Sequence, residues 1–195
     1  MNSILQQKSL NYLNYFCKEV KDRSVGRPGA IDNATGVTIL LILAELLKDY
    51  DGNKLIELVA FNGEDYYSVP GQMEYIKANQ NNFASIFLNI NIDGAAYKLG
   101  NTSFSSFDLE VPLEKKLEEI IKSYPGIVRG SKWAQGDHSI FLQYGVPAVA
   151  VSSKWFIDNI DSQEITHTAK DNLNIVDSNK IIEIAAALNE FIRKI

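Results

Sequence analysis

The chain has 195 residues, of which 46% are hydrophobic, so it is long enough for one domain with a real core and short for two. Its 19 basic and 24 acidic residues give a formal net charge of −5, which argues against a surface that binds nucleic acids or anionic membranes. The single cysteine excludes a disulfide framework and a four-cysteine zinc site. Because the sequence shows neither a signal peptide nor an apolar run of about 20 residues, we expect a cytoplasmic protein.

The N-terminal half is expected to contain three helices and two strands. A helix over about residues 4–22 is predicted by apolar side chains at helical spacing, namely Leu10, Leu13, Phe16, Cys17 and Val20. Asp32 or Asn33 can cap a second helix that runs to about Asp49. The next elements are expected to be a buried strand, a short helix and a second strand, at residues 55–61, 71–78 and 84–92.

The C-terminal half continues the alternation of strands and helices. The polar and aromatic stretch 97–111 is expected to form a hairpin or edge strands, and Pro112 starts a helix that ends before Pro125. A third strand is predicted at 146–152, and an amphipathic helix at 178–195. This order predicts an α/β fold of three layers, with a mostly parallel central sheet flanked by helices.

Acidic residues follow the ends of the predicted strands. Glu64 and Asp65 come after the first strand, Asp93 comes after the second, and Asp32 lies in a glycine-rich turn that enters a helix. Functional groups in open α/β sheets gather beyond the carboxyl ends of the strands, so these acids are expected to converge. His167 would join them from a late loop.

Converging carboxylates are unfavourable unless a cation neutralises them, and carboxylates with one imidazole suit zinc. Catalytic zinc has about three protein ligands and one open position, and a neighbouring carboxylate that is not a ligand can take the proton of the bound water. Glu64 and Asp65 could divide these two roles. Taken singly, Asp32 is a possible helix cap, Asp93 a turn residue and His167 an ordinary histidine.

In this combination the sequence resembles the co-catalytic zinc exopeptidases that include bacterial leucine aminopeptidase, with glutaminyl cyclases as relatives. Five segments match in the order of the family, at residues 32–36, 60–65, 91–94, 136–141 and 167–171. The likeness extends from about residue 28 to the C-terminus. We therefore predict a single domain over 1–195, with an N-terminal helix and junction at 1–27 and a family-like core at 28–195.

The resemblance implies a role for each candidate residue. Asp32 would bridge two metal ions, and Glu64 would be the general base. Asp65 and His167 would complete one metal site, and Asp93 would belong to the other. The family more often has glutamate at the position of Asp65, which leaves the ligand chemistry unchanged but shortens the side chain by one methylene.

The second metal site lacks an expected histidine. The resemblance implies a His-x-Asp element upstream of Asp32, whereas the chain has only His138 and His167, and His138 matches a position that is not a usual ligand. Either Val20 has replaced the histidine and Asp22 is the aspartate of that element, or the whole element is absent. We favour its absence, because Val20 fits the predicted helix face.

Absence of this element would also remove N-terminal strands and leave one edge of the sheet bare. We expect the helix at 4–22, or a second subunit in a homo-oligomer, to cover that edge. A set of ligands for a single zinc ion would survive, namely Asp32, Asp65 and His167. One zinc ion is therefore expected rather than two.

The leading hypothesis is a metal-dependent hydrolase of the exopeptidase kind, an aminopeptidase that acts on peptide or aminoacyl substrates with a free N-terminus. One alternative is a non-catalytic family member that serves as a binding or structural protein. Another is an acyltransferase similar to glutaminyl cyclase, with a single zinc. A shortened version of a longer enzyme is a further possibility, and the sequence leaves open whether catalysis is retained.

Overall fold

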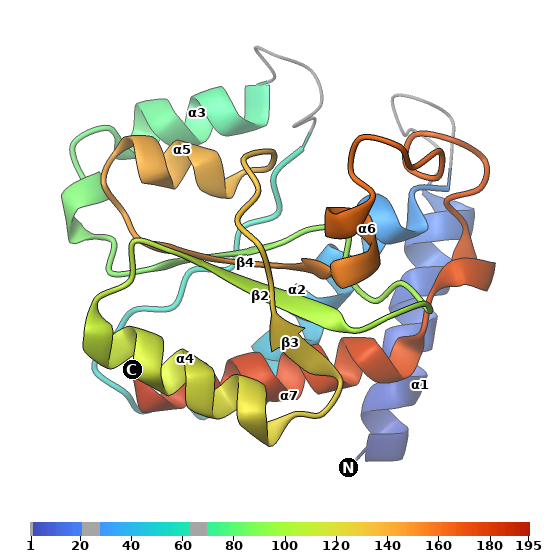
Figure 1. The fold of residues 1–195 in the computed structure, drawn as a ribbon, viewed down its shortest axis with the longest axis horizontal. Helices are drawn as coiled ribbons and strands as arrows, with labels where there is room; N and C mark the ends of the chain where they lie inside the picture. The colour runs from blue at the N-terminus through green and yellow to red at the C-terminus, as the bar shows by residue number, and fades with distance from the viewer. Residues whose placement is uncertain (1, 21–27, 63–69) are drawn as a thin grey trace.

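A computed structural model describes residues 2–20, 28–62 and 70–195, and it shows one sheet between two layers of helices (Figure 1). In chain order the elements are α1 (Asn2–Asn14), η1 (Tyr15–Glu19), η2 (Ala30–Ala34), α2 (Thr35–Leu46), α3 (Pro70–Asn79), η3 (Phe83–Ser85), β1 (Asn89–Ile92), β2 (Thr102–Phe107), α4 (Val111–Ser123), β3 (Ile127–Arg129), α5 (His138–Gln143), β4 (Ala148–Ser153), α6 (Lys154–Asp158), η4 (Leu173–Ile175) and α7 (Ser178–Lys194).

The four strands of the sheet have the order β1-β4-β2-β3. β1 runs parallel to β4, with Asn89 beside Ala148, and β2 runs parallel to β3, with Thr102 beside Ile127. The central pair, β2 and β4, is antiparallel, with Thr102 beside Ser153. Two of the three pairings are thus parallel, and the predicted α/β fold with a mostly parallel sheet is confirmed.

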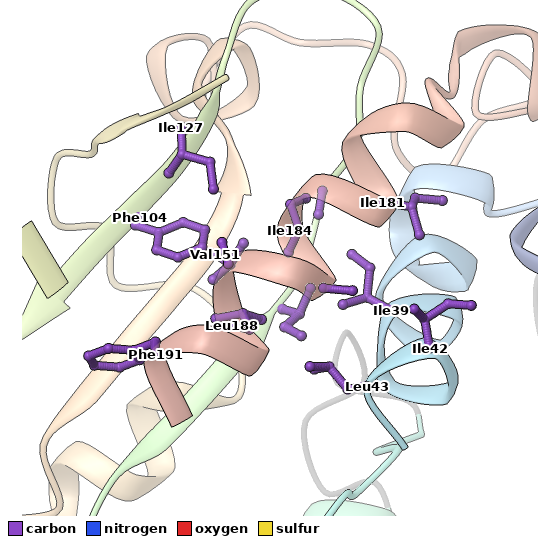
Figure 2. Close-up of a cluster of buried hydrophobic side chains, with 14 of the residues drawn as sticks. Ile39, Ile42, Leu43, Phe104, Ile127, Val151, Ile181, Ile184, Leu188 and Phe191 are labelled. Atoms are coloured by element: carbon purple, nitrogen blue, oxygen red, sulfur yellow. The ribbon is translucent and has the colours of Figure 1, made fainter. Parts of the chain in front are cut away.

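The main core lies between the sheet and helices α2 and α7 (Figure 2). The sheet contributes Phe104 and Val151, which meet Leu188 and Phe191 of α7 and Ile39 of α2, and none of these five side chains is exposed to solvent. Burying a side chain of this size contributes roughly 1.5–3 kcal/mol. This cluster fixes α2, whose N-terminal end carries one of the candidate site residues.

The opposite face of the sheet is covered by α3 and α5, which lie together on the side away from α4 and α7 (Figure 1). Aromatic rings join these elements: Phe141 of α5 lies 5.7 Å from Tyr75 of α3 and 5.8 Å from Phe83, measured between ring centroids. α3 directly follows residues 63–69 in the chain.

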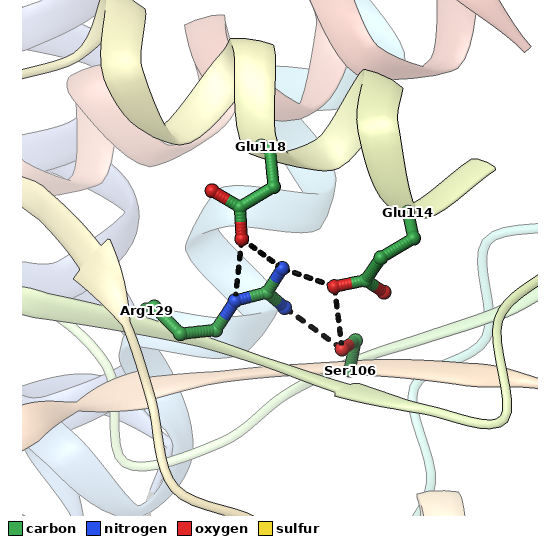
Figure 3. A network of polar contacts seen from close by, with 4 residues as sticks. All are labelled: Ser106, Glu114, Glu118 and Arg129. Carbon is green, nitrogen blue, oxygen red and sulfur yellow. Dashed lines mark hydrogen bonds and ion pairs between the residues drawn. The ribbon is translucent and has the colours of Figure 1, made fainter. Parts of the chain in front are cut away.

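A polar network ties the sheet to α4 (Figure 3). The Arg129 guanidinium on β3 donates to Glu114 and to Glu118, and its Nη1 donates to Ser106 Oγ on β2 at 2.7 Å. Exposed ion pairs contribute little by themselves, but a guanidinium held by several partners is geometrically specific. The network holds the outer strand β3 in place.

Most of the predicted helices are confirmed. The helix expected at 4–22 is α1 followed by the π-helical turn η1, and the helices expected at 71–78, 112–124 and 178–195 are α3, α4 and α7. Val20 lies just beyond η1 and is 37% exposed. The argument that Val20 belongs to a buried helix face is therefore wrong, and Asp22 lies outside the described residues.

Two predictions for the sheet are wrong. Residues 55–61 form no strand, and Leu55 is 96% exposed, because no described strand pairs with this segment. The segment 97–111 supplies β2, which is a central strand and not an edge or hairpin. Its serines suggested a polar edge, but Ser103 and Ser105 are fully buried, and the Ser105 hydroxyl donates to the carbonyl of Ser131 at 2.7 Å.

β1 forms one edge of the sheet and β3 the other, since within the described part of the chain β1 pairs with β4 alone and β3 with β2 alone. The edge at β1 is the one called the free edge below. α1 packs against α2 and α7 and does not line the space beside β1. The expectation that this helix covers the edge is wrong, and cover by a second subunit stays a prediction. Within the described ranges, no helix is long and apolar enough to cross a membrane.

The core makes a direct prediction for stability. Leu188→Ala should lower the free energy of unfolding by about 2–5 kcal/mol, because the fully buried side chain leaves a cavity between α7 and the sheet. The matched control is Leu55→Ala, at an almost fully exposed side chain, which should change it by less than about 0.5 kcal/mol. Urea unfolding measures both, and equal effects would contradict this description of the core.

Candidate active site

Asp32 lies in a turn that is fixed by the side chain of the next residue. Asn33 Oδ1 accepts a hydrogen bond from the Gly36 backbone at 2.9 Å, so Asn33 caps α2. The other end of the Asn33 amide donates to the carbonyl of Ile92 at 2.8 Å, at the end of β1. A Cβ on residue 36 would lie 2.4 Å from Asn33 Oδ1 and 2.6 Å from this carbonyl, so glycine is required there.

A buried carboxylate holds the same turn from the other side. Asp171 is 1% exposed, and its two oxygens accept hydrogen bonds from the backbone amides of Ile31 at 2.6 Å and Asp32 at 3.1 Å. Hydrogen bonds to a charged acceptor are stronger than neutral ones, and they satisfy amides that the non-helical turn leaves without helical partners. The turn and the loop around Asp171 therefore form one unit.

This unit brings His167 to Asp32. Nε2 of His167 lies 2.9 Å from Oδ2 of Asp32, and the two side chains are 50% and 24% exposed. His167 has a φ of +59°, which is uncommon for a residue with a Cβ and carries a strain of about 1–3 kcal/mol. Gln163 holds the loop just before it, since its side-chain oxygen accepts from the Ile165 and Thr166 amides. The loop thus presents the imidazole to the carboxylate.

Asp93 lies at the same end of the sheet. It directly follows β1, and its backbone amide donates to the Val151 carbonyl on β4 at 2.9 Å. The hydrogen bond between Asn33 and Ile92 joins the residue after Asp32 to the residue before Asp93. Asp32 and Asp93 are 61 positions apart in the sequence, and the hydrogen bond between their chain neighbours brings the two backbones together.

The remaining candidates, Glu64 and Asp65, lie outside the described residues, as do Tyr66 and Tyr67. Their roles as base and ligand stay predictions. Within the described ranges, no group of three or more side chains from histidine, cysteine, aspartate and glutamate is placed to hold a metal ion. A site with three such ligands would therefore need at least one residue from outside these ranges, where Asp22, Glu64 and Asp65 lie.

His138 is a structural residue. It is fully buried, its Nε2 lies 3.0 Å from the Trp133 carbonyl, and its Nδ1 lies 3.4 Å from the Asn91 side-chain nitrogen. These partners fit a neutral ring that donates through Nε2 and accepts at Nδ1. Burial lowers the pKa of His138 below its usual value, which also favours the neutral form. Only one of the two imidazoles of the chain is therefore available to a metal.

Asp171 is the functional residue that the sequence analysis missed. It was included as the last residue of a matching segment, four positions after His167, but no role was assigned to it. Its partner amide on Ile31 is 140 positions away, so local sequence carried no signal for this contact.

Comparisons with known proteins place this geometry in context. The model of Peptidase family M28 matches residues 18–192. No curated protein matches the sequence. Among solved structures, an aminopeptidase from Aneurinibacillus sp. strain AM-1 has 20% identity and a TM-score of 0.69, over 86% of this chain and 40% of that one. A zinc aminopeptidase from Bacillus subtilis has 17% identity and a TM-score of 0.69, over 86% and 42%.

A glutaminyl cyclase from Porphyromonas gingivalis is similar at 15% identity and a TM-score of 0.64, over 87% of this chain and 64% of that one. At these identities the likeness shows the fold. The chain spans only about two fifths of the length of the two aminopeptidases, whose coverage is 40% and 42%.

The role of the Asp171 carboxylate can be tested by replacing one of its oxygens with an NH₂ group. Asp171→Asn should lower the free energy of unfolding by about 1.5–3 kcal/mol, because its two oxygens accept from two different amides and the new NH₂ group would face a donor. The control is Asp177→Asn, whose side chain accepts from Asn179 at the start of α7. Asparagine caps a helix as well as aspartate, so this change should cost about 0.5 kcal/mol or less. Equal losses in urea unfolding would contradict the assigned role of Asp171.

The buried state of His138 predicts a dependence of stability on pH. Below pH 6.5 the unfolded chain takes up a proton at this residue that the folded chain does not, because the folded pKa is lowered. The free energy of unfolding should therefore fall as the pH drops from 7.5 to 5. The dependence on pH should be shallower in His138→Gln, by less than the one-proton limit of about 1.4 kcal/mol per pH unit. Parallel curves for the two proteins would show that His138 is not the cause.

Proposed function

Because the chain belongs to peptidase family M28, we propose that it is a zinc-dependent hydrolase that acts at the free amino end of peptides or aminoacyl compounds. The observation that carries the proposal is the 2.9 Å approach of the His167 imidazole to the Asp32 carboxylate. Support also comes from the similar aminopeptidase folds.

A single zinc ion fits the residues of the chain better than two. Asp32 and His167 supply one oxygen and one nitrogen donor of the types that zinc takes, and we propose Asp65 as the third ligand. The other histidine, His138, has both ring nitrogens engaged inside the fold. A second zinc site would have Asp93 but no imidazole ligand, so we propose that it binds zinc only weakly.

The proposed reaction divides between the metal and the side chains. Zinc, when bound, supplies the positive charge that polarises a carbonyl group and acidifies water. The Glu64 carboxylate accepts a proton from the attacking water and passes it to the nitrogen of the leaving amine, so the amide bond breaks as the new C–O bond forms. Asp171 acts as a positioning residue, because it fixes the backbone of Asp32.

A second candidate function is the cyclisation of N-terminal glutamine. The chain covers more of the glutaminyl cyclase than of either aminopeptidase, and a site with one zinc is also our proposal here. In this reaction the α-amine of the substrate attacks its own side-chain amide and ammonia leaves. The non-catalytic alternative is the result expected if neither activity is present.

The base assignment is tested by Glu64→Gln. The variant should lose at least about a hundredfold in the hydrolysis of leucine p-nitroanilide, because the amide cannot accept the proton of water. Zinc retained after equilibrium dialysis at neutral pH should remain near one ion per chain, since Glu64 is not a proposed ligand. Unchanged turnover in this variant would refute the assignment.

The matched control is His167→Gln, which should lose both zinc and activity, because it removes the imidazole donor. Release of pyroglutamate from a peptide with N-terminal glutamine, without hydrolysis of leucine p-nitroanilide, would favour the second candidate. Failure of the wild-type chain to retain zinc or to turn over either substrate would favour the non-catalytic alternative.

A further inference from the structure

A cavity of about 620 Å³ lies beside the free edge of the sheet. Its lining includes β1 and residues 54–61. α2 and α7 add apolar side chains to this lining, namely the half-buried Val37 and Leu40 and, more deeply, Ile192. Leu55 and Phe87 on its margins are 96% and 48% exposed, so apolar surface is open to solvent here.

β1 offers hydrogen-bonding groups to this cavity. In a parallel pair, alternate residues point their backbone groups at the neighbouring strand. The amides of Asn89 and Asp93 donate to carbonyls on the β4 side, so the backbone groups of Ile90 and Ile92 point the other way. The Ile92 carbonyl is taken by Asn33, which leaves Ile90 as the centre of the open edge.

The other lining segment, residues 54–61, belongs to no helix or strand and forms no backbone hydrogen bond with any other described residue. The sequence Lys-Leu-Ile-Glu-Leu-Val-Ala-Phe is rich in residues that favour strands. An extended polypeptide in the cavity would pair with the open edge of β1, as peptides do when they add a strand to a sheet edge.

One end of the cavity lies next to the candidate active site, because Asn33 and Ile92, the chain neighbours of Asp32 and Asp93, line it. Its lining there also includes Asn91 and Asp137. The Asp137 carboxylate at this end favours a positively charged amine. The other end carries the Lys54 ammonium, which lies 4.7 Å from the centroid of the Phe87 ring. The cavity thus has a direction that suits a peptide whose free amino end lies at the site.

We propose that this cavity binds the leading residues of an extended peptide substrate, antiparallel to β1, with the free amine toward Asp32. The assignment rests on the proposed function and names its substrate class. β1 has four residues, so about four residues of the substrate are paired. Every second side chain of the peptide faces the apolar wall of α2 and α7, so peptides with apolar residues at alternate positions are preferred.

The test measures binding without turnover, in the zinc-loaded Glu64→Gln chain. The probe is Leu-Ser-Leu-Ser-Leu with a free amine and a fluorophore at its carboxyl end, followed by fluorescence anisotropy. Ile90→Pro removes the outward backbone N–H of β1. Ile90→Val keeps this N–H, and valine has the same number of side-chain carbons as proline. We expect the dissociation constant to rise about tenfold with proline and to change less than about twofold with valine. Equal effects of the two changes would overturn the proposal.

A second probe makes the result independent of how the proline variant folds. The same peptide with N-methyl groups on its second, third and fourth residues cannot donate to a strand, and it should bind the Glu64→Gln chain at least about tenfold more weakly. Equal binding of the two probes would refute strand pairing.

The size of the free protein distinguishes the other occupants. Light scattering should give the same mass with and without the probe. A dimer that the peptide dissociates would mean that a second copy fills the cavity, and would overturn the proposal. Hydrolysis of leucine p-nitroanilide by the wild-type chain reports the proposed function alone, because a substrate with a single residue cannot pair along the four residues of β1. Activity without peptide binding would therefore reject the cavity assignment and keep the hydrolase.

Discussion

The candidate site depends on one buried carboxylate. Asp171 joins the turn at Asp32 to the loop that carries His167, through hydrogen bonds to the amides of Ile31 and Asp32. Its own amide is held within the loop by the carbonyl of Thr168, so the contact connects two local structures that are each closed by hydrogen bonds. The left-handed backbone of His167 is sustained by this arrangement, because an isolated loop would relax to a more favourable φ.

Much of the fold could be predicted from the spacing of apolar residues and from residues that start or end helices. α7 and α4 were predictable because their apolar residues recur at helical spacing and Pro112 lies in the first turn of α4. β2 was not, because its buried serines resemble a polar edge, and their burial is set by the strands on either side. The segment 55–61 has the composition of a buried strand, but a strand also requires a neighbour, which local sequence does not specify.

The residues of the candidate site could be predicted from the sequence more readily than their arrangement in space. The positions of Asp32, Asp93 and His167 near strand ends and loops indicated a common location, and the described structure holds Asp32 and His167 together. The role of Asp171 was hidden, because it acts on backbone amides 140 positions away. The two histidines looked alike in the sequence, and only packing separates His138, between Trp133 and Phe107, from His167.

The strand order has a consequence for how the chain reaches its fold. β4 lies between β1 and β2, although it follows both of them in the sequence by more than 40 positions. During synthesis from the N-terminus, β1 and β2 therefore have no shared neighbour until Ala148–Ser153 has emerged. Sheets closed by such distant pairings form slowly, and their unpaired strands remain exposed in the meantime. β4 is thus the strand that completes the sheet, and it joins β1 to β2 only late in synthesis.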